Sequence, residues 1–124
     1  VAAIIAGKVN VTHYDGTGST GTLSITAPTI EISGIIDANY AGYRGGYSEG
    51  TGIGERPAAG GGYGGTGGDA AIELSPPAKG GSSYGDPNSR EIQMGSPGGD
   101  FEVSGTKVPG GDGGGALTLH ADSL

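Results

Sequence analysis

Clusters of glycine, set between short apolar segments, constrain the fold of this chain more than any other feature of its sequence. Of its 124 residues, 30 are glycine and 7 are proline. Each glycine inside a helix destabilises that helix by about 1 kcal/mol relative to alanine. Residues 42–68 form the longest glycine-rich stretch, and an irregular loop of that length is rare in a compact domain. The chain is therefore either disordered or an unusual β architecture, because its composition excludes an ordinary helical or doubly wound domain.

The placement of the apolar residues favours the β architecture. They alternate with polar residues at a spacing of two, which predicts strands with one buried face, and no window shows the helical period. The predicted strands lie in residues 8–11, 21–27, 29–33, 71–74, 91–94, 101–103 and 116–121.

Two internal repeats indicate how these strands are arranged. Residues 115–124 match residues 21–30 as Gly-x-Leu-x-(Leu/Ile)-x-Ala-x-(Ser/Thr)-(Leu/Ile), at an offset of 94. Residues 32–38 match residues 5–11 at an offset of 27, which is the length of one solenoid repeat. The sequence predicts a single all-β domain over residues 1–124, a parallel β-helix (β-solenoid) with long glycine-rich loops.

Each end of the chain carries half of a repeat. The chain begins with a second half and stops at Leu124 with a first half. Two explanations remain open. The chain is either a piece of a longer repeat protein or a subunit whose ends complement each other head to tail in a filament. The expected partners are flanking repeats in the first case and other copies of the chain in the second.

Several stretches also resemble a known class of protein region. They are residues 32–39, 60–68, 83–87, 95–99 and 110–115. Together they resemble the glycine-rich parallel β-helix regions of large secreted and cell-surface proteins of microbes. The resemblance covers residues 21–124 and implies an extracellular structural or adhesive module. Tyr40 departs from the pattern, because a glycine is usual at its position, and Asp100 and Phe101 interrupt a glycine run.

Charge and composition exclude several classes of function. The chain has 13 acidic residues against 6 lysines and arginines, which argues against binding to nucleic acid or to anionic membrane surfaces. It has no cysteine for disulfides or thiol chemistry. No apolar run approaches the ~20 residues of a membrane-spanning helix, so no membrane insertion is expected.

No enzyme is predicted. Catalysis on a β-helix would resemble the polysaccharide lyases, which need a cationic base beside clustered carboxylates on one strand face. Here the six basic residues are spread singly, and no strand carries two carboxylates at a spacing of two. His13 and His120 are isolated from each other and from any metal-binding pattern.

Tyrosines form the strongest binding candidates. The candidate residues are Tyr40, Tyr43, Arg44, Tyr47, Tyr63 and Tyr84, all in or beside glycine-rich segments. Tyrosine presents both an aromatic face and a hydroxyl, which suits sugar stacking. A second interpretation is that the rings cover glycine backbone that has no side chains of its own.

Two further sites are suggested by short motifs. Residues 64–72 approximate the calcium-binding pattern Gly-Gly-x-Gly-x-Asp-x-U-x, although Ala71 stands where a large aliphatic residue is expected. The candidate calcium ligands are Asp69, Asp86 and Asp112, with Asp100 in a similar glycine turn. Asn10 begins an Asn-x-Thr sequon, which is a glycosylation site in a secretory context.

The leading functional prediction is a non-catalytic extracellular structural module that self-associates by strand stacking into a filament or surface scaffold. The alternative is a cell-surface adhesin, stabilised by calcium, that binds glycans through its tyrosine- and glycine-rich loops.

Overall fold

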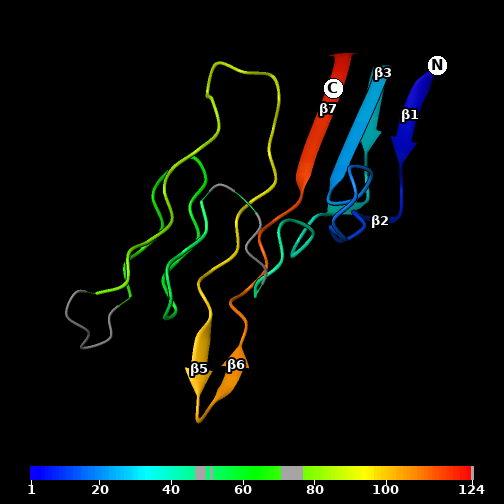
Figure 1. Cartoon of the computed structure of the whole chain (residues 1–124). Coiled ribbons are helices and arrows are strands. Elements are labelled where there is room, and N and C mark those ends of the chain that lie inside the picture. Colours follow the sequence, from blue (N-terminus) through cyan, green and yellow to red (C-terminus); the bar gives the residue numbers. More distant parts are fainter. Residues whose placement is uncertain (47–49, 51, 71–76, 124) are drawn as a thin grey trace.

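The computed structural model describes residues 1–46, 50, 52–70 and 77–123, and within these ranges the chain is all-β (Figure 1). The strands are β1 (Ala2–Ile5), β2 (Lys8–Asn10), β3 (Thr22–Ile32), β4 (Ile35–Asp37), β5 (Phe101–Val103), β6 (Thr106–Val108) and β7 (Ala116–Ser123). The described residues contain no helix, and therefore none that is long and apolar enough to cross a membrane. The lack of helical periodicity in the sequence predicted this, and the prediction is confirmed for the described part of the chain.

Parallel pairing stacks the strands in three layers. The layers are β1 with β2, then β3 with β4, then β7, and they form the sheets β1-β3-β7 and β2-β4. Ile5 lies opposite Ile32 and Lys8 opposite Ile35, so layers one and two are offset by 27 residues. Leu23 lies opposite Leu117, so β3 and β7 are offset by 94. These offsets equal the two repeats in the sequence, and each layer therefore places equivalent residues on top of one another.

The burial of side chains along β3 changes phase at Pro28 and Thr29. Before this point the half-buried residues are the odd-numbered Leu23, Ile25 and Ala27, whereas after it the buried residue is the even-numbered Ile30. The apolar residues of the sequence shift by one position at the same place, so each half of the strand buries its own apolar side chains.

Most of the chain between β4 and β7 forms a bundle of extended segments without strand pairing, to the left of and below the sheet in Figure 1. We call residues 41–46, 50, 52–70, 77–100 and 109–115 the glycine bundle. Its segment 59–62 is joined by backbone hydrogen bonds of 2.7–2.9 Å to four other segments, at Gly52, Gly68, Gly81 and Gly99. A strand in a flat sheet has only two neighbours. Segment 59–62 therefore has neighbours on several sides and is not part of a flat sheet.

The absence of side chains permits this packing. At Gly81 an added Cβ would overlap the carbonyl oxygen of Gly52, so the two backbones are in direct contact. The side chains that are buried inside the described part of the bundle are small, namely Ala41, Ala59, Ala70, Ala78, Ser96 and Pro97. Backbone hydrogen bonds and close backbone contact therefore replace the large apolar core of an ordinary domain.

The bundle leaves and rejoins the stacked strands at one place. The backbone N–H of Gly115 donates to the carbonyl oxygen of Ala38 at 2.8 Å, which closes the long excursion between β4 and β7. In the layer below, the N–H of Gly21 donates to the carbonyl oxygen of Thr12 at 2.8 Å and closes the short loop between β2 and β3.

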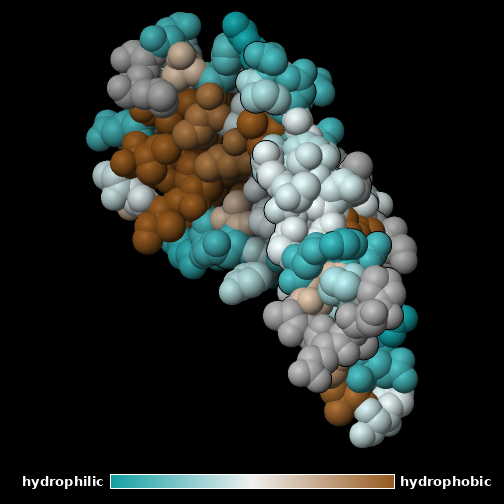
Figure 2. Space-filling view, turned by 90° about the vertical axis from the view of Figure 1, so that its left-hand side faces the viewer, coloured by the Kyte–Doolittle hydropathy of each residue, from teal (hydrophilic) through white to brown (hydrophobic). Residues whose placement is uncertain are grey.

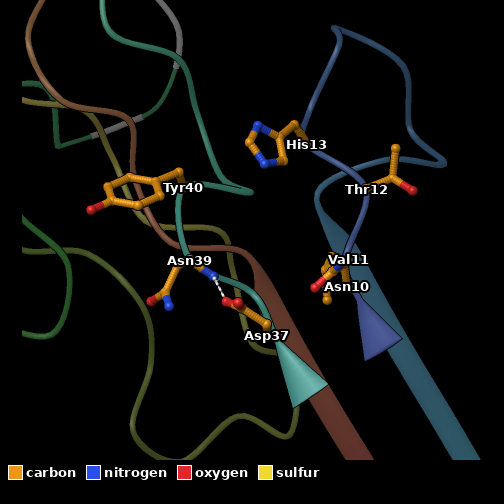
Figure 3. Close-up of a pocket in the computed structure, with 7 residues that line it drawn as sticks. All are labelled: Asn10, Val11, Thr12, His13, Asp37, Asn39 and Tyr40. Atoms are coloured by element: carbon orange, nitrogen blue, oxygen red, sulfur yellow. Dashed lines mark hydrogen bonds between the residues drawn. The ribbon is translucent and has the colours of Figure 1, made fainter. Parts of the chain in front are cut away.

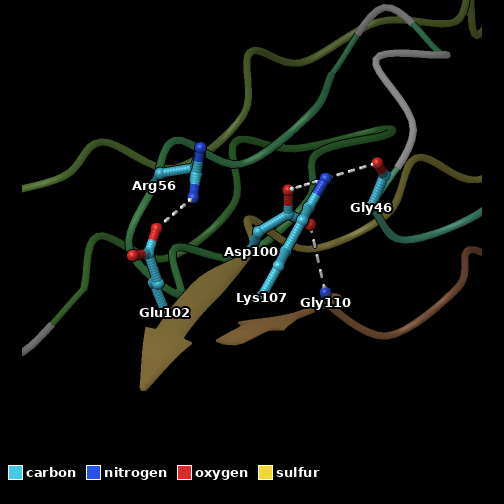
Figure 4. Close-up of polar contacts among 6 residues, drawn as sticks. All are labelled: Gly46, Arg56, Asp100, Glu102, Lys107 and Gly110. Atoms are coloured by element: carbon cyan, nitrogen blue, oxygen red, sulfur yellow. Dashed lines mark hydrogen bonds and ion pairs between the residues drawn. The ribbon is translucent and has the colours of Figure 1, made fainter. Parts of the chain in front are cut away.

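Strands β5 and β6 form an antiparallel hairpin that projects from the bundle (Figure 1). Both residues of its two-residue turn, Ser104 and Gly105, have positive φ, as the hairpin turn of type I′ requires. Figure 4 shows how the hairpin is attached: Lys107 Nζ lies 2.9 Å from Asp100 Oδ2 and donates to the carbonyl oxygen of Gly46 at 2.7 Å.

The strands predicted separately over residues 21–27 and 29–33 form one strand, β3. Two other predicted strands have different outcomes. The prediction of a strand over residues 91–94 is wrong, because this segment has no ladder partner and its backbone is bound by tyrosine hydroxyls instead. The N–H of Gln93 donates to the hydroxyl of Tyr63 at 3.3 Å, and the hydroxyl of Tyr84 donates to the carbonyl oxygen of Met94. The predicted strand over residues 71–74 lies outside the described residues.

Candidate functional site

The stacking of layers one and two continues past the strands and builds a groove. The N–H of Val11 donates to the carbonyl oxygen of Asp37 at 2.8 Å, and the N–H of Tyr14 donates to that of Ala41 at 3.0 Å. The register of β2 and β4 therefore extends into the following turns, where residues 10–13 lie beside residues 37–40. The two turns enclose a groove of about 570 Å³.

We call this site the Tyr40 groove; it is lined by residues 10–13 together with Asp37, Asn39 and Tyr40 (Figure 3). Tyr40 and His13 occupy equivalent positions in the two layers, and in Figure 3 their rings project from the backbone to the same side. The lining combines these two rings with amide, hydroxyl and carboxylate groups, which is typical of a site for a polar ligand with a flat apolar face.

Asp37 is held in place by two partners inside the chain. Its Oδ2 lies 2.9 Å from Lys8 Nζ, and its Oδ1 accepts the backbone N–H of Asn39 at 3.0 Å. The hydrogen bond from Lys8, followed by that from the Asn39 backbone, lowers the pKa of Asp37 below its ordinary value. The carboxylate is therefore ionised and paired with Lys8, and its bond to Asn39 holds the turn that carries Asn39 and Tyr40.

Tyr40 has a backbone conformation that its side chain does not favour. Its φ is +57°, in the left-handed region that costs a residue with a Cβ about 1–2 kcal/mol. The side chain is 66% exposed, so little packing compensates for this cost. Glycine adopts such a φ without this cost, so the backbone itself favours glycine at this position.

The other described tyrosines pack as pairs over the glycine bundle. Tyr43 meets Tyr14 edge to face with ring centroids 5.2 Å apart, and Tyr63 meets Tyr84 in the same way at 5.0 Å. The rings of Tyr43 and Tyr84 contact Gly50 and Gly52, where an added Cβ would come within 2.8 Å of the ring. This contact favours the second interpretation for these residues, that they cover glycine backbone.

Tyr63 and Tyr84 also border a smaller groove of about 290 Å³ that includes Asp86. Burial raises the pKa of the Tyr84 hydroxyl above its ordinary value, and this hydroxyl is engaged by Ser96 Oγ, which donates to it at 3.1 Å. Arg44 is exposed, and Tyr47 lies outside the described residues.

The aspartates that were predicted as calcium ligands lie in separate places. Asp69 pairs with Lys79 at 2.7 Å. Asp86 Oδ1 accepts the N–H of Asn88 at 2.8 Å, and Asp112 Oδ1 accepts the N–H of Gly45 at 2.8 Å. Asp100 pairs with Lys107. Across the described residues no three His, Asp or Glu side chains gather into a group that could hold a metal ion.

Asn10, the predicted glycosylation site, ends β2 and is exposed at the rim of the Tyr40 groove. The sequence reasoning found Tyr40 and Asn10 but missed that they share a site, and it did not propose Thr12, His13, Asp37 or Asn39 as binding residues. The repeat at an offset of 27 was the available signal. Extended by two residues, it places residues 12 and 13 beside Asn39 and Tyr40.

Comparisons of the chain with models of protein families, with curated proteins and with solved structures found no match.

Proposed function

We propose that the chain is a non-catalytic structural module of β-solenoid type, and that copies of it stack end to end into an extracellular filament or scaffold. The observation that carries this proposal is that paired strands are offset by 27 and 94 residues, which are the offsets of the two sequence repeats. Because equivalent residues stack in each layer, one more layer with the same pattern would fit on the last one by the same contacts.

A difference in exposure between two equivalent residues indicates where a further strand could be added to the stack. Ile5 and Ile32 lie opposite each other on one face, but Ile5 is 9% exposed and Ile32 is 42% exposed. Among the described residues, no strand continues the third layer over Ile32. In the proposed assembly, β1 of the next copy continues the third layer after Ser123, which lies opposite Thr29, and covers Ile32.

The surface of the chain agrees with this arrangement. Figure 2 shows hydrophobic residues gathered in one broad patch, bordered by hydrophilic residues, beside the nearly white surface of the glycine bundle. The accessible surface is 7610 Å², whereas a folded monomer of this mass exposes about 5,900 Å². An exposed apolar patch of this kind is typical of an interaction surface. The extracellular location rests on the resemblance to β-helix regions of microbial cell-surface proteins.

Sedimentation velocity over a wide range of protein concentration, followed by negative-stain microscopy, tests the proposal. We expect association that increases with concentration and fibres with an axial repeat. The variant Ile32→Lys places a charge on the stacking face and should shift the chain to monomer. The matched control is Ile4→Lys, because Ile4 shares the opposite face with Glu31 and is already 66% exposed.

Two results would overturn self-association. The first is a chain that sediments as a monomer at every concentration. The second is equal association of the Ile32→Lys and Ile4→Lys variants, since association would then not use the stacking face.

A further inference from the structure

We infer that the Tyr40 groove binds a neutral saccharide, with a pyranose ring stacked on the side chain of Tyr40. The groove is formed within one chain, so this inference does not rest on the assembly proposed above. The first observation behind it is the conformation of Tyr40. A tyrosine at φ +57° that remains 66% exposed is strained without being packed. Such residues concentrate where a side chain must be presented to a ligand.

The second observation is the set of polar groups beside the ring. Asn10, Thr12 and Asn39 line the groove with two amides and one hydroxyl (Figure 3). Among the described residues, these three side chains have no hydrogen-bond partner within the protein. Amide and hydroxyl groups both donate and accept hydrogen bonds, as sugar hydroxyls do. An aromatic face with such groups at its edge matches the apolar face and polar rim of a pyranose.

The charges in the groove distinguish a neutral ligand from a charged one. The Asp37 carboxylate is paired with Lys8 and also accepts the N–H of Asn39, so its charge is already compensated and offers little to a cation. Lys8 is occupied by the same ion pair, and the chain as a whole carries a net charge of −7. Neither Asp37 nor Lys8 therefore offers an unpaired charge to a ligand in this groove.

A residue-resolved titration tests the inference. The chain is produced without glycosylation, so that Asn10 is unmodified, and its backbone amides are followed by NMR during addition of cellohexaose, maltohexaose or xylohexaose. We expect at least one of these neutral oligosaccharides to cause saturable shifts confined to residues 10–13 and 37–40. Affinity in the range of about 0.1–10 mM is sufficient for this measurement.

Variants separate a binding role of Tyr40 from a structural one. Glycine adopts positive φ readily, so Tyr40→Gly should fold at least as stably as the native chain and yet lose binding by about tenfold or more, the loss expected of a stacking contact. Tyr40→Phe keeps the stacking face and should retain most of the affinity. Phe101→Ala removes an exposed aromatic side chain far from the groove in the fold and should change nothing.

Three results would overturn the inference. They are the absence of shifts with all three oligosaccharides at about 10 mM, unchanged affinity in the Tyr40→Gly variant, and shifts of the same residues by tetramethylammonium. The last result would show a site for a cation that uses the Tyr40 ring and Asp37.

Discussion

Leu23 and Leu117 lie opposite each other in the parallel ladder of β3 and β7, and both occupy the same position of a repeat whose copies are 94 residues apart. The same relationship holds for Ile5 and Ile32 at an offset of 27. Strand pairing over these distances has no local turn to set its register. We therefore attribute the register to the side chains, because a slip by one residue would turn every apolar side chain to the opposite face.

The contact between Leu23 and Leu117 should be measurable as an interaction energy. Both residues are half-buried, so Leu23→Ala and Leu117→Ala should each lower the free energy of unfolding by about 1–2 kcal/mol. The double variant should lose less than the sum, because the second substitution removes a contact already lost. Urea unfolding measures the three values. Thr26→Ala, at an exposed position of the same strand, is the control, and strictly additive losses would contradict the contact.

Backbone contact in the glycine bundle predicts that two glycines respond with opposite signs. Gly81→Ala should destabilise the fold by about 1–3 kcal/mol, because its Cβ would overlap the Gly52 carbonyl oxygen and overpacking has that cost. Gly68→Ala has open space around its Cβ and should be neutral or stabilising by about 0.5 kcal/mol. Thermal or urea unfolding of the two variants compares them directly. Equal effects would show that the segments do not pack through their glycines.

The Asp15 carboxylate should titrate at unusually low pH. The hydroxyls of Thr17 and Thr20 donate to its Oδ1 at 2.7 and 2.8 Å, and these bonds lower its pKa to about 2. The stabilisation they give is present at pH values above the ordinary pKa of 3.8 and is lost as the pH falls through about 2. NMR of the side-chain carboxyl should show the pKa rising in Thr17→Val. Ser19→Ala, which removes no bond to Asp15, should leave it unchanged.

Lys107 should stabilise the attachment of the hairpin more than Arg56 does. Asp100 is 12% exposed in its side chain, and the hydrogen bond from Lys107 lowers its pKa. Lys107→Met leaves this carboxylate without its cation and should lower the melting temperature at neutral pH. The difference from the native chain should shrink on acidification through the lowered pKa, where the native chain loses the same stabilisation.

Arg56→Met provides the matched control for that measurement. Arg56 and Glu102 are 3.5 Å apart, and both side chains are 57% exposed. Exposed pairs of this kind contribute about 0–1 kcal/mol, so this variant should melt close to the native chain at every pH. A larger loss in Arg56→Met than in Lys107→Met would contradict the greater contribution of the Lys107 ion pair.

The stacked strands were predictable from the sequence because their side chains carry the pattern. Alternation located β3 and β7, and the offsets of the two repeats, 27 and 94, equal those of the parallel pairs. The short antiparallel hairpin was predicted only in its first strand, around Phe101. Its second strand consists of Thr106, Lys107 and Val108 only. Three residues with a single apolar side chain are too short to show alternation.

The glycine bundle was not predictable to the same degree. A glycine has no side chain whose spacing could reveal which neighbour it faces, and the contact between Gly81 and Gly52 leaves no trace in composition. Residues 91–94 show the related difficulty, since their alternation is typical of a strand while tyrosine hydroxyls take their backbone groups. The Tyr40 groove was predictable in part. Tyr40 and Asn10 were each candidates in the sequence, but only the repeat at an offset of 27 indicates that their segments lie side by side.

The two loop-closing hydrogen bonds, from Gly21 to Thr12 and from Gly115 to Ala38, have the same length although one loop spans residues 13–20 and the other residues 39–114. The corner of the stack therefore accommodates both a short and a very long intervening chain. The chain between these two points can therefore differ greatly in length while the closing hydrogen bond is kept. For protein engineering, the same corner is a natural place to graft a foreign domain onto a repetitive support.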